Sequence, residues 1–194
     1  MQKHPIILAS NSPRRRDLLR QIGLDFTVEP ADVDERALPG ESPETYAVRV
    51  ALEKARVASQ RAGAGVVIAA DTIVVLDADI LGKPADHRDA ERMLAMLSGR
   101  MHRVITGLAV MDAATGKALV RVSETKVWFR HLSPDDITWY VGTGEPLDKA
   151  GAYGIQGKGA LLVSRIEGCY FNVVGLPLSL LFEMLRDLGI NLLL

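Results

Sequence analysis

The sequence predicts an α/β fold with a mixed β-sheet. Short apolar strands alternate with amphipathic helices in the first part of the chain, which is typical of α/β proteins. Two long segments in the middle of the chain resemble strands, flank a turn at Thr115-Gly116 and indicate an antiparallel pair. Alternation followed by an antiparallel pair favours a sheet of mixed direction.

The first strand is predicted at residues 6–9, and a turn leads from it directly into a helix. Ser12 has the side chain of an N-cap, and Pro13 suits the first helical position. Gly23 is a stop signal for this helix. Its buried face is expected to consist of Leu18, Leu19 and Ile22.

A second helix is predicted from Ser42-Pro43 to about Ala62. Small apolar side chains recur on one of its faces at helical spacing, which indicates that this face is buried. The face consists of Ala47, Val50, Ala51, Ala55 and Ala58.

Residues 66–76 form an apolar run with one carboxylate, Asp71, in its middle. Such a run is typical of a strand covered on both faces, where an unpaired charge is costly. Asp71 therefore requires a cation, a metal ion or strong hydrogen-bond donors. The alternative is a strand that ends at Ala70, with Asp71 capping a turn before a second strand.

The remaining elements follow from the same signals of periodicity, capping and turns. They are a helix at 86–97 with Ala90, Met93, Leu94 and Leu97 buried, strands at 101–111 and 119–129, a capped helix at 133–141, a glycine-rich segment at 151–159, a strand at 160–166 and a helix at 178–188.

Composition indicates an ordinary globular protein, with 48% hydrophobic and 24% charged residues. A net charge of -1, no polybasic tail and 5% aromatic residues argue against nucleic-acid or membrane partners. The apolar runs fall short of the ~20 residues of a membrane span. One cysteine, Cys169, excludes an intrachain disulfide and suits a reducing cytosol. We therefore expect a cytoplasmic protein; the sequence leaves open whether it forms a homodimer.

The turn from the first strand into the first helix is a candidate phosphate site. It carries Arg14, Arg15 and Arg16 at a helix N-terminus, where backbone N–H groups and the helix dipole favour anions. Arg15 precedes Leu18 and Leu19 by three and four residues, so it shares their face. We interpret Arg14 and Arg15 as phosphate contacts and Arg16 as solvated.

Two lysines and one glutamine are further candidates. Lys54 lies within the apolar face of the second helix, where snorkelling to water is the likelier interpretation for one lysine taken alone. Lys83 lies on a rigid turn shortly after the Asp71 strand pair, and lysines are ordinary in turns. Gln156 lies in the glycine-rich segment, where its amide could bind the edge of a base. A flexible surface loop is the alternative for that segment.

Six short motifs together resemble the Maf family of nucleoside triphosphate pyrophosphatases. They cover nearly the whole chain in the family's order. The motifs are Ser10-Asn-Ser-Pro-Arg-Arg, Glu53-Lys54-Ala55-Arg56, Ala70-Asp71-Thr72, Gly82-Lys83-Pro84, Ser98-Gly99 with His102 and Thr106, and Gly151-Ala-Tyr-Gly-Ile-Gln-Gly.

The resemblance implies an elongated α/β fold like that of the inosine triphosphate pyrophosphatases, with a cleft between two lobes of one domain spanning residues 1–194. It implies hydrolysis of a nucleoside triphosphate to the monophosphate and pyrophosphate with a divalent cation, Mg²⁺ or Mn²⁺. The intact Tyr153-Gly-Ile-Gln-Gly segment resembles the branch that acts on dTTP and UTP, rather than the branch that acts on 7-methyl-GTP.

The resemblance also assigns roles to residues. Asp71 matches the catalytic base, and whether it serves mainly as base or as metal ligand stays open. Asp71 and Glu35 would bind the metal, although Asp34 could compete with Glu35. The substrate-binding positions are Ser10, Arg14, Arg15, Lys54, Thr72, Lys83 and Gln156.

Two other functions are compatible with the sequence. One is a pyrophosphatase for modified purine nucleotides on the same scaffold. The other is a non-catalytic regulator of cell division that senses nucleotides. The acidic and cationic residues together disfavour pure binding, because a carboxylate next to a triphosphate does not help affinity.

Overall fold

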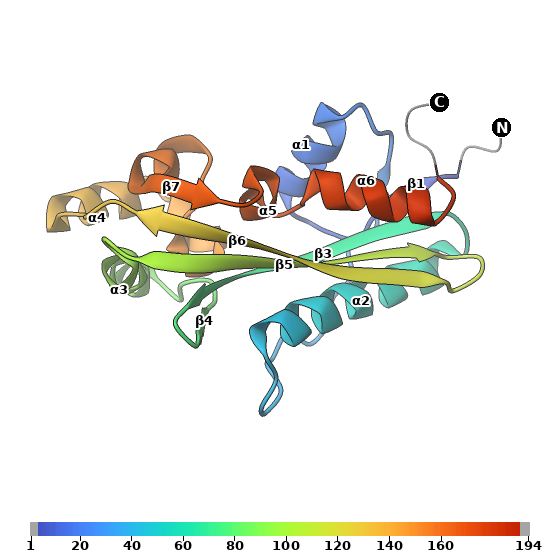
Figure 1. The fold of residues 1–194 in the computed structure, drawn as a ribbon, viewed down its shortest axis with the longest axis horizontal. Helices are drawn as coiled ribbons and strands as arrows, with labels where there is room; N and C mark the ends of the chain where they lie inside the picture. The colour runs from blue at the N-terminus through green and yellow to red at the C-terminus, as the bar shows by residue number, and fades with distance from the viewer. Residues whose placement is uncertain (1–3, 191–194) are drawn as a thin grey trace. The chain divides into compact units, whose positions relative to one another are not determined.

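The computed structural model describes residues 4–190 and shows a mixed α/β fold, as predicted (Figure 1). Its sheet has seven strands within this range, in the order β2-β1-β3-β5-β6-β7, with β4 paired to β3. The strands are β1 (Ile6–Leu8), β2 (Thr27–Val28), β3 (Val66–Leu76), β4 (Asp79–Leu81), β5 (Met101–Asp112), β6 (Ala118–Phe129) and β7 (Val163–Glu167). The sheet is mixed because β1 runs parallel to β2 and β3, whereas β3–β4 and β6–β7 are antiparallel.

Four helices of the described range begin at caps that the sequence signals. Ser12, Ser42, Asp86 and Ser133 each accept a backbone N–H in the first turn of their helix. The α-helices are α1 (Pro13–Gln21), α2 (Pro43–Ala62), α3 (His87–Leu97), α4 (Pro134–Val141), α5 (Tyr170–Val174) and α6 (Leu178–Asp187). Three 3₁₀ segments are η1 (Glu145–Asp148), η2 (Ala150–Ala152) and η3 (Gly157–Leu162).

Two local predictions were wrong, and one short element was missed. Ile22 is 44% exposed, because α1 ends at Gln21 and Ile22 is the C-cap rather than part of the buried face. The predicted strand at 160–166 begins only at Val163, because residues 157–162 form a 3₁₀ helix. The short helix α5 was not predicted.

The chain divides into two compact units. The first comprises Met1–Asp71, Thr106–Ser123 and Gly175–Leu194, and the second Thr72–Ile105 and Glu124–Val174. One domain over 1–194 and a cleft between two lobes stay predictions.

In the first unit, helices α2 and α6 cover opposite faces of the sheet (Figure 1). The α2 side is filled by small and branched side chains, as the alanine-rich face predicts. This core cluster consists of Ile7, Ala9, Ala51, Ala55, Ala58, Val67, Ala69, Ala109 and Met111.

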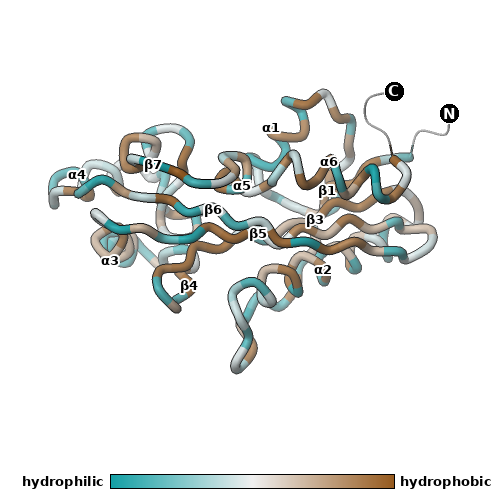
Figure 2. The backbone as a smooth tube through the Cα atoms, in the orientation of Figure 1, coloured by the Kyte–Doolittle hydropathy of each residue, from teal (hydrophilic) through white to brown (hydrophobic). Residues whose placement is uncertain are grey.

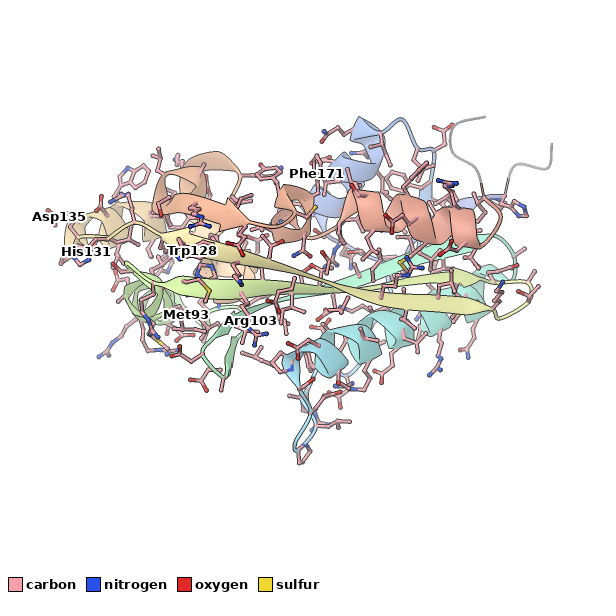
Figure 3. The ribbon with its side chains drawn as sticks, in the orientation of Figure 1. Met93, Arg103, Trp128, His131, Asp135 and Phe171 are labelled. Atoms are coloured by element: carbon pink, nitrogen blue, oxygen red, sulfur yellow. The ribbon has the colours of Figure 1, made fainter. Side chains whose placement is uncertain are left out.

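The second unit has its own core. Figure 2 shows hydrophobic residues along β4 and the adjoining part of β3, where Val74, Leu76 and Leu81 are buried. Helix α3 adds the four side chains predicted to be buried, Ala90, Met93, Leu94 and Leu97. Figure 3 labels Met93 on that helix. No helix in residues 4–190 is long and apolar enough to cross a membrane.

Candidate functional site

Strand β3 places Asp71 on the face that α2 covers. Side chains alternate between the two faces of a strand, so Asp71 projects to the same side as Val67 and Ala69, which pack against α2. β3 is continuous from Val66 to Leu76, and Asp71 is only 7% exposed. The alternative, a strand that ends at Ala70, is therefore wrong.

Lys54 is the cation that the buried carboxylate requires. Its Nζ lies 2.8 Å from Asp71 Oδ1 and 2.6 Å from Glu35 Oε1. Lys54 is 9% exposed, so it does not snorkel to water, and the interpretation favoured for the isolated lysine was wrong. Its neighbour Glu53 instead approaches Arg49, with 3.4 Å between Nη1 and Oε1. One buried cation thus joins two carboxylates that are distant in the sequence.

The structure separates Glu35 from its competitor Asp34. Asp34 is exposed and forms an ion pair with Arg36, at 2.6 Å between Oδ2 and Nη2. Hydrogen bonds from Arg36 hold the pKa of Asp34 at about 2. Glu35 approaches Lys54, and its backbone carbonyl accepts a hydrogen bond of 2.7 Å from the Tyr46 hydroxyl. Glu35 is therefore the acidic residue of this loop that belongs to the site.

Arg15 is held in place by two groups of the first unit. Its Nε donates to the Gly175 carbonyl at 2.8 Å, and its Nη1 donates to Ser10 Oγ at 3.2 Å. Ser10, which is buried, also accepts the N–H of Ser12, so it links the end of β1 to the start of α1. Burial lowers the pKa of Arg15, the charge of Asp71 raises it and Arg14 lowers it. Asp71, Arg15 and Arg14 are therefore close enough to interact electrostatically.

The other predicted residues have less structural support. Arg14 lies in the first turn of α1 next to Arg15, and Thr72 follows Asp71 on β3; both are partly buried. Lys83 follows β4 and Gln156 precedes η3, and both side chains are exposed. Lys83 and Gln156 belong to the second unit, and their roles stay predictions.

The sequence did not reveal two members of the site. Tyr46 is buried on α2, and its hydroxyl fixes the backbone at Glu35. The sequence feature that could have indicated Tyr46 is a hydroxyl-bearing aromatic residue beside the apolar face of that helix. Gly175 contributes a backbone carbonyl, which no side-chain pattern can reveal.

The carboxylates fit a metal ion that arrives with its substrate. The described residues contain no group of three or more His, Cys, Asp or Glu that could hold a metal ion. Mg²⁺, however, is commonly bound through one or two carboxylates together with substrate phosphates. Asp71 and Glu35, which share Lys54, satisfy that smaller requirement.

The chain belongs to the Maf family: residues 5–188 match the family described as Maf-like protein. This confirms the resemblance seen in the motifs. A dTTP/UTP pyrophosphatase of Symbiobacterium thermophilum is 53% identical over 184 residues, 95% of this chain and 94% of the relative. One of Syntrophomonas wolfei is 50% identical over 186 residues, 96% of this chain and 98% of the relative. Among solved structures, a HAM1 protein from Coxiella burnetii has a TM-score of 0.48 and 19% identity, covering 65% of this chain and 73% of its own.

Proposed function

We propose that the protein is a nucleoside triphosphate pyrophosphatase that converts dTTP and UTP to the monophosphate and pyrophosphate. The observation that carries the proposal is the buried Lys54 held between Asp71 and Glu35, with Arg15 nearby. The names of the relatives, which are similar over nearly their whole length, support the same reaction.

Asp71 is the proposed general base. It takes the proton from a water molecule that attacks the α-phosphorus of the nucleotide, and pyrophosphate leaves. Lys54 binds Oδ1 of Asp71 and so fixes the orientation of this carboxylate. Arg14, Arg15 and Lys83 are the cations assigned to the phosphates, whose negative charge increases on the leaving group.

Asp71 and Glu35 would hold the divalent cation, Mg²⁺ or Mn²⁺. When bound, such an ion neutralises phosphate charge and makes water a better nucleophile. Lys54 binds both carboxylates and so holds the exposed Glu35 next to the buried Asp71.

Gln156 is the proposed reader of the base. Thymine and uracil share an O4 acceptor and an N3–H donor, which one glutamine amide can match. Cytosine reverses this pattern, so it would leave the amide poorly paired at about 1–3 kcal/mol per unsatisfied group. The cytoplasmic location, the absence of nucleic-acid and membrane partners and a homodimer stay predictions.

Initial rates of pyrophosphate release test the proposal. Wild-type protein with Mg²⁺ should hydrolyse dTTP and UTP faster than CTP, GTP and ATP at equal concentration. Asp71→Asn should lose at least about 100-fold in kcat, the lower range for a general base. Asp34→Asn is the matched control, since that carboxylate pairs with Arg36 outside the site.

Three outcomes would contradict parts of the proposal. A preference for a purine triphosphate would favour the modified-purine enzyme. Binding of dTTP without turnover would favour a nucleotide-sensing regulator. A Gln156→Glu variant with an unchanged ratio of dTTP to CTP hydrolysis would remove the base-reading role of Gln156.

A further inference from the structure

The loop that carries Gln156 is fixed on both sides of that residue. Before it, the Gly154 N–H donates to the Tyr140 hydroxyl at 3.2 Å, and Ile155 is buried. After it, the N–H groups of Lys158 and Gly159 donate to the Glu145 carboxylate at 3.2 and 3.3 Å. Gln156 itself is exposed between these two anchors.

The backbone of this loop approaches its anchors as closely as glycine permits. Gly157 has a φ of +61°, and a Cβ there would lie 3.0 Å from Glu145 Oε1. A Cβ on Gly159 would lie 2.0 Å from the Gly154 carbonyl oxygen and 2.7 Å from the Tyr140 hydroxyl. The two ends of the loop therefore touch each other beside Tyr140, and the glycines are required by this contact.

The anchors are themselves held by their own segment. The Thr143 hydroxyl donates to the Tyr140 carbonyl at 2.7 Å and accepts the Glu145 N–H at 3.2 Å. Lys149 Nζ donates to the Glu145 carbonyl at 2.5 Å. Tyr140 is fully buried, and burial raises its pKa to about 12, so its hydroxyl stays protonated at neutral pH.

We propose that Glu145, together with Tyr140, is a positioning residue that sets the choice of nucleotide base through the Gln156 loop. This inference rests on the proposed function. An amide distinguishes uracil from cytosine only if its donor and acceptor are held in one orientation. Glu145 holds the loop in one conformation, because its carboxylate accepts the N–H groups of Lys158 and Gly159, just after Gln156.

The inference makes a prediction about kinetic constants. Glu145→Ala should raise the KM for dTTP about tenfold and reduce the dTTP-to-CTP ratio of kcat/KM by a similar factor. The kcat for dTTP should stay within about threefold, because Asp71 and Lys54 are untouched. Glu145→Gln should recover part of the ratio, because the amide oxygen can still accept one N–H.

A matched control is available in the same unit. Glu167 on β7 is exposed and pairs with Arg165 and Lys126. Arg165 also stacks over Trp128, at 4.5 Å from the ring centroid. Glu167→Ala removes a carboxylate from two exposed ion pairs without touching the loop, and its nucleotide preference should equal that of the wild type. Amide hydrogen exchange of residues 154–160 provides a second readout, which should accelerate in Glu145→Ala and not in Glu167→Ala.

The outcomes separate this inference from the proposed function. If the wild type hydrolyses no triphosphate, the proposed function fails and the role in base choice falls with it. If the wild type prefers dTTP and Glu145→Ala keeps the same ratio, only the positioning role is wrong. If Glu145→Ala does not fold, Glu145→Gln decides: an unchanged ratio and unchanged exchange in that variant overturn the inference, and a partial loss of both supports it.

Discussion

At the scale of single residues, Lys54 is the ion-pair partner of a carboxylate that lies in the interior. Asp71 is 7% exposed, so its charge is unfavourable without a partner, and Lys54 Nζ lies 2.8 Å away. Removing one partner of a buried ion pair typically costs about 3–5 kcal/mol, because the other charge remains buried.

Lys54→Met should therefore lower the free energy of unfolding at neutral pH by about 3–5 kcal/mol. It should also weaken the stabilisation of the transition state, measured through kcat/KM for dTTP, by roughly 2–4 kcal/mol, because one preorganised charge is lost. Urea unfolding and initial rates measure the two effects. Glu53→Gln is the control, since Glu53 neighbours Lys54 in the sequence but pairs with Arg49.

A double variant checks the cause of this instability. Lys54→Met combined with Asp71→Asn removes both charges of the buried pair, so the double variant should be more stable than Lys54→Met alone. Equal stability of the two would contradict the ion pair as the reason. Wild-type stability and kcat/KM in Lys54→Met would restore the snorkelling interpretation.

Glu35 and Asp34 provide a comparison of neighbouring carboxylates. Glu35→Gln removes a charge next to Lys54, so kcat should fall and the Mg²⁺ concentration for half-maximal rate should rise, each about tenfold or more. Asp34→Asn should keep kcat and the half-maximal Mg²⁺ concentration within about twofold of the wild type, because exposed ion pairs contribute little. Titration of the rate with Mg²⁺ measures this difference, and the opposite order would exchange the roles of the two residues.

At the scale of elements, α2 approaches β5 so closely that only glycine fits at position 107. A Cβ on Gly107 would lie 2.1 Å from the Ala47 carbonyl oxygen, far inside van der Waals contact. This close approach seats the helix that carries Tyr46 and Lys54 on the sheet.

Gly107→Ala should therefore destabilise the protein by about 1–3 kcal/mol or more, the cost of overpacking, because the helix must shift. Gly82→Ala is the control: its Cβ would meet nothing within 4 Å, so stability should change by less than about 0.5 kcal/mol. Thermal or urea unfolding compares the two. A neutral Gly107→Ala would mean that α2 can move without cost.

At the scale of the whole molecule, one buried histidine links stability to pH. His102 is 1% exposed, its Nε2 lies 2.7 Å from the Tyr153 hydroxyl, and its Nδ1 has no hydrogen-bond partner in the described part of the chain. Burial lowers the pKa of His102 to about 4, so the ring is neutral in the folded protein at neutral pH.

This pKa predicts the direction of the pH dependence. In the unfolded chain the pKa of histidine is about 6.5, so between pH 6.5 and 4 the unfolded state binds the extra proton. The contribution of neutral His102 is therefore complete above pH 6.5 and is lost as the pH falls toward 4, by up to about 3 kcal/mol. The free energy of unfolding, measured with urea at pH values from 7 to 4, should fall less steeply with decreasing pH in His102→Gln than in the wild type. His131 is exposed, so His131→Gln should show the wild-type dependence of the unfolding free energy on pH. The same pH dependence in all three proteins would contradict the prediction.

Much of the local structure could be predicted because its signals are local. Ser12, Ser42 and Ser133 mark helix starts through their own side chains and the prolines that follow them. The alanine stripe of α2 predicts its buried face, since side chains three and four residues apart share a helix face. α5 escaped prediction because its five residues are too few to establish a helical period.

The sequence by itself determined the α/β class, most element boundaries, the family and the residues that could carry chemistry. Only the tertiary structure decided how the residues of the first unit associate: that Lys54 bridges Asp71 and Glu35, and that Asp34 turns to Arg36 instead. The physical reason is that helix and strand periods act over a few residues. The partner of a buried charge depends on how α2, β3 and the loop before α2 pack together, and that packing is a property of contacts between distant segments.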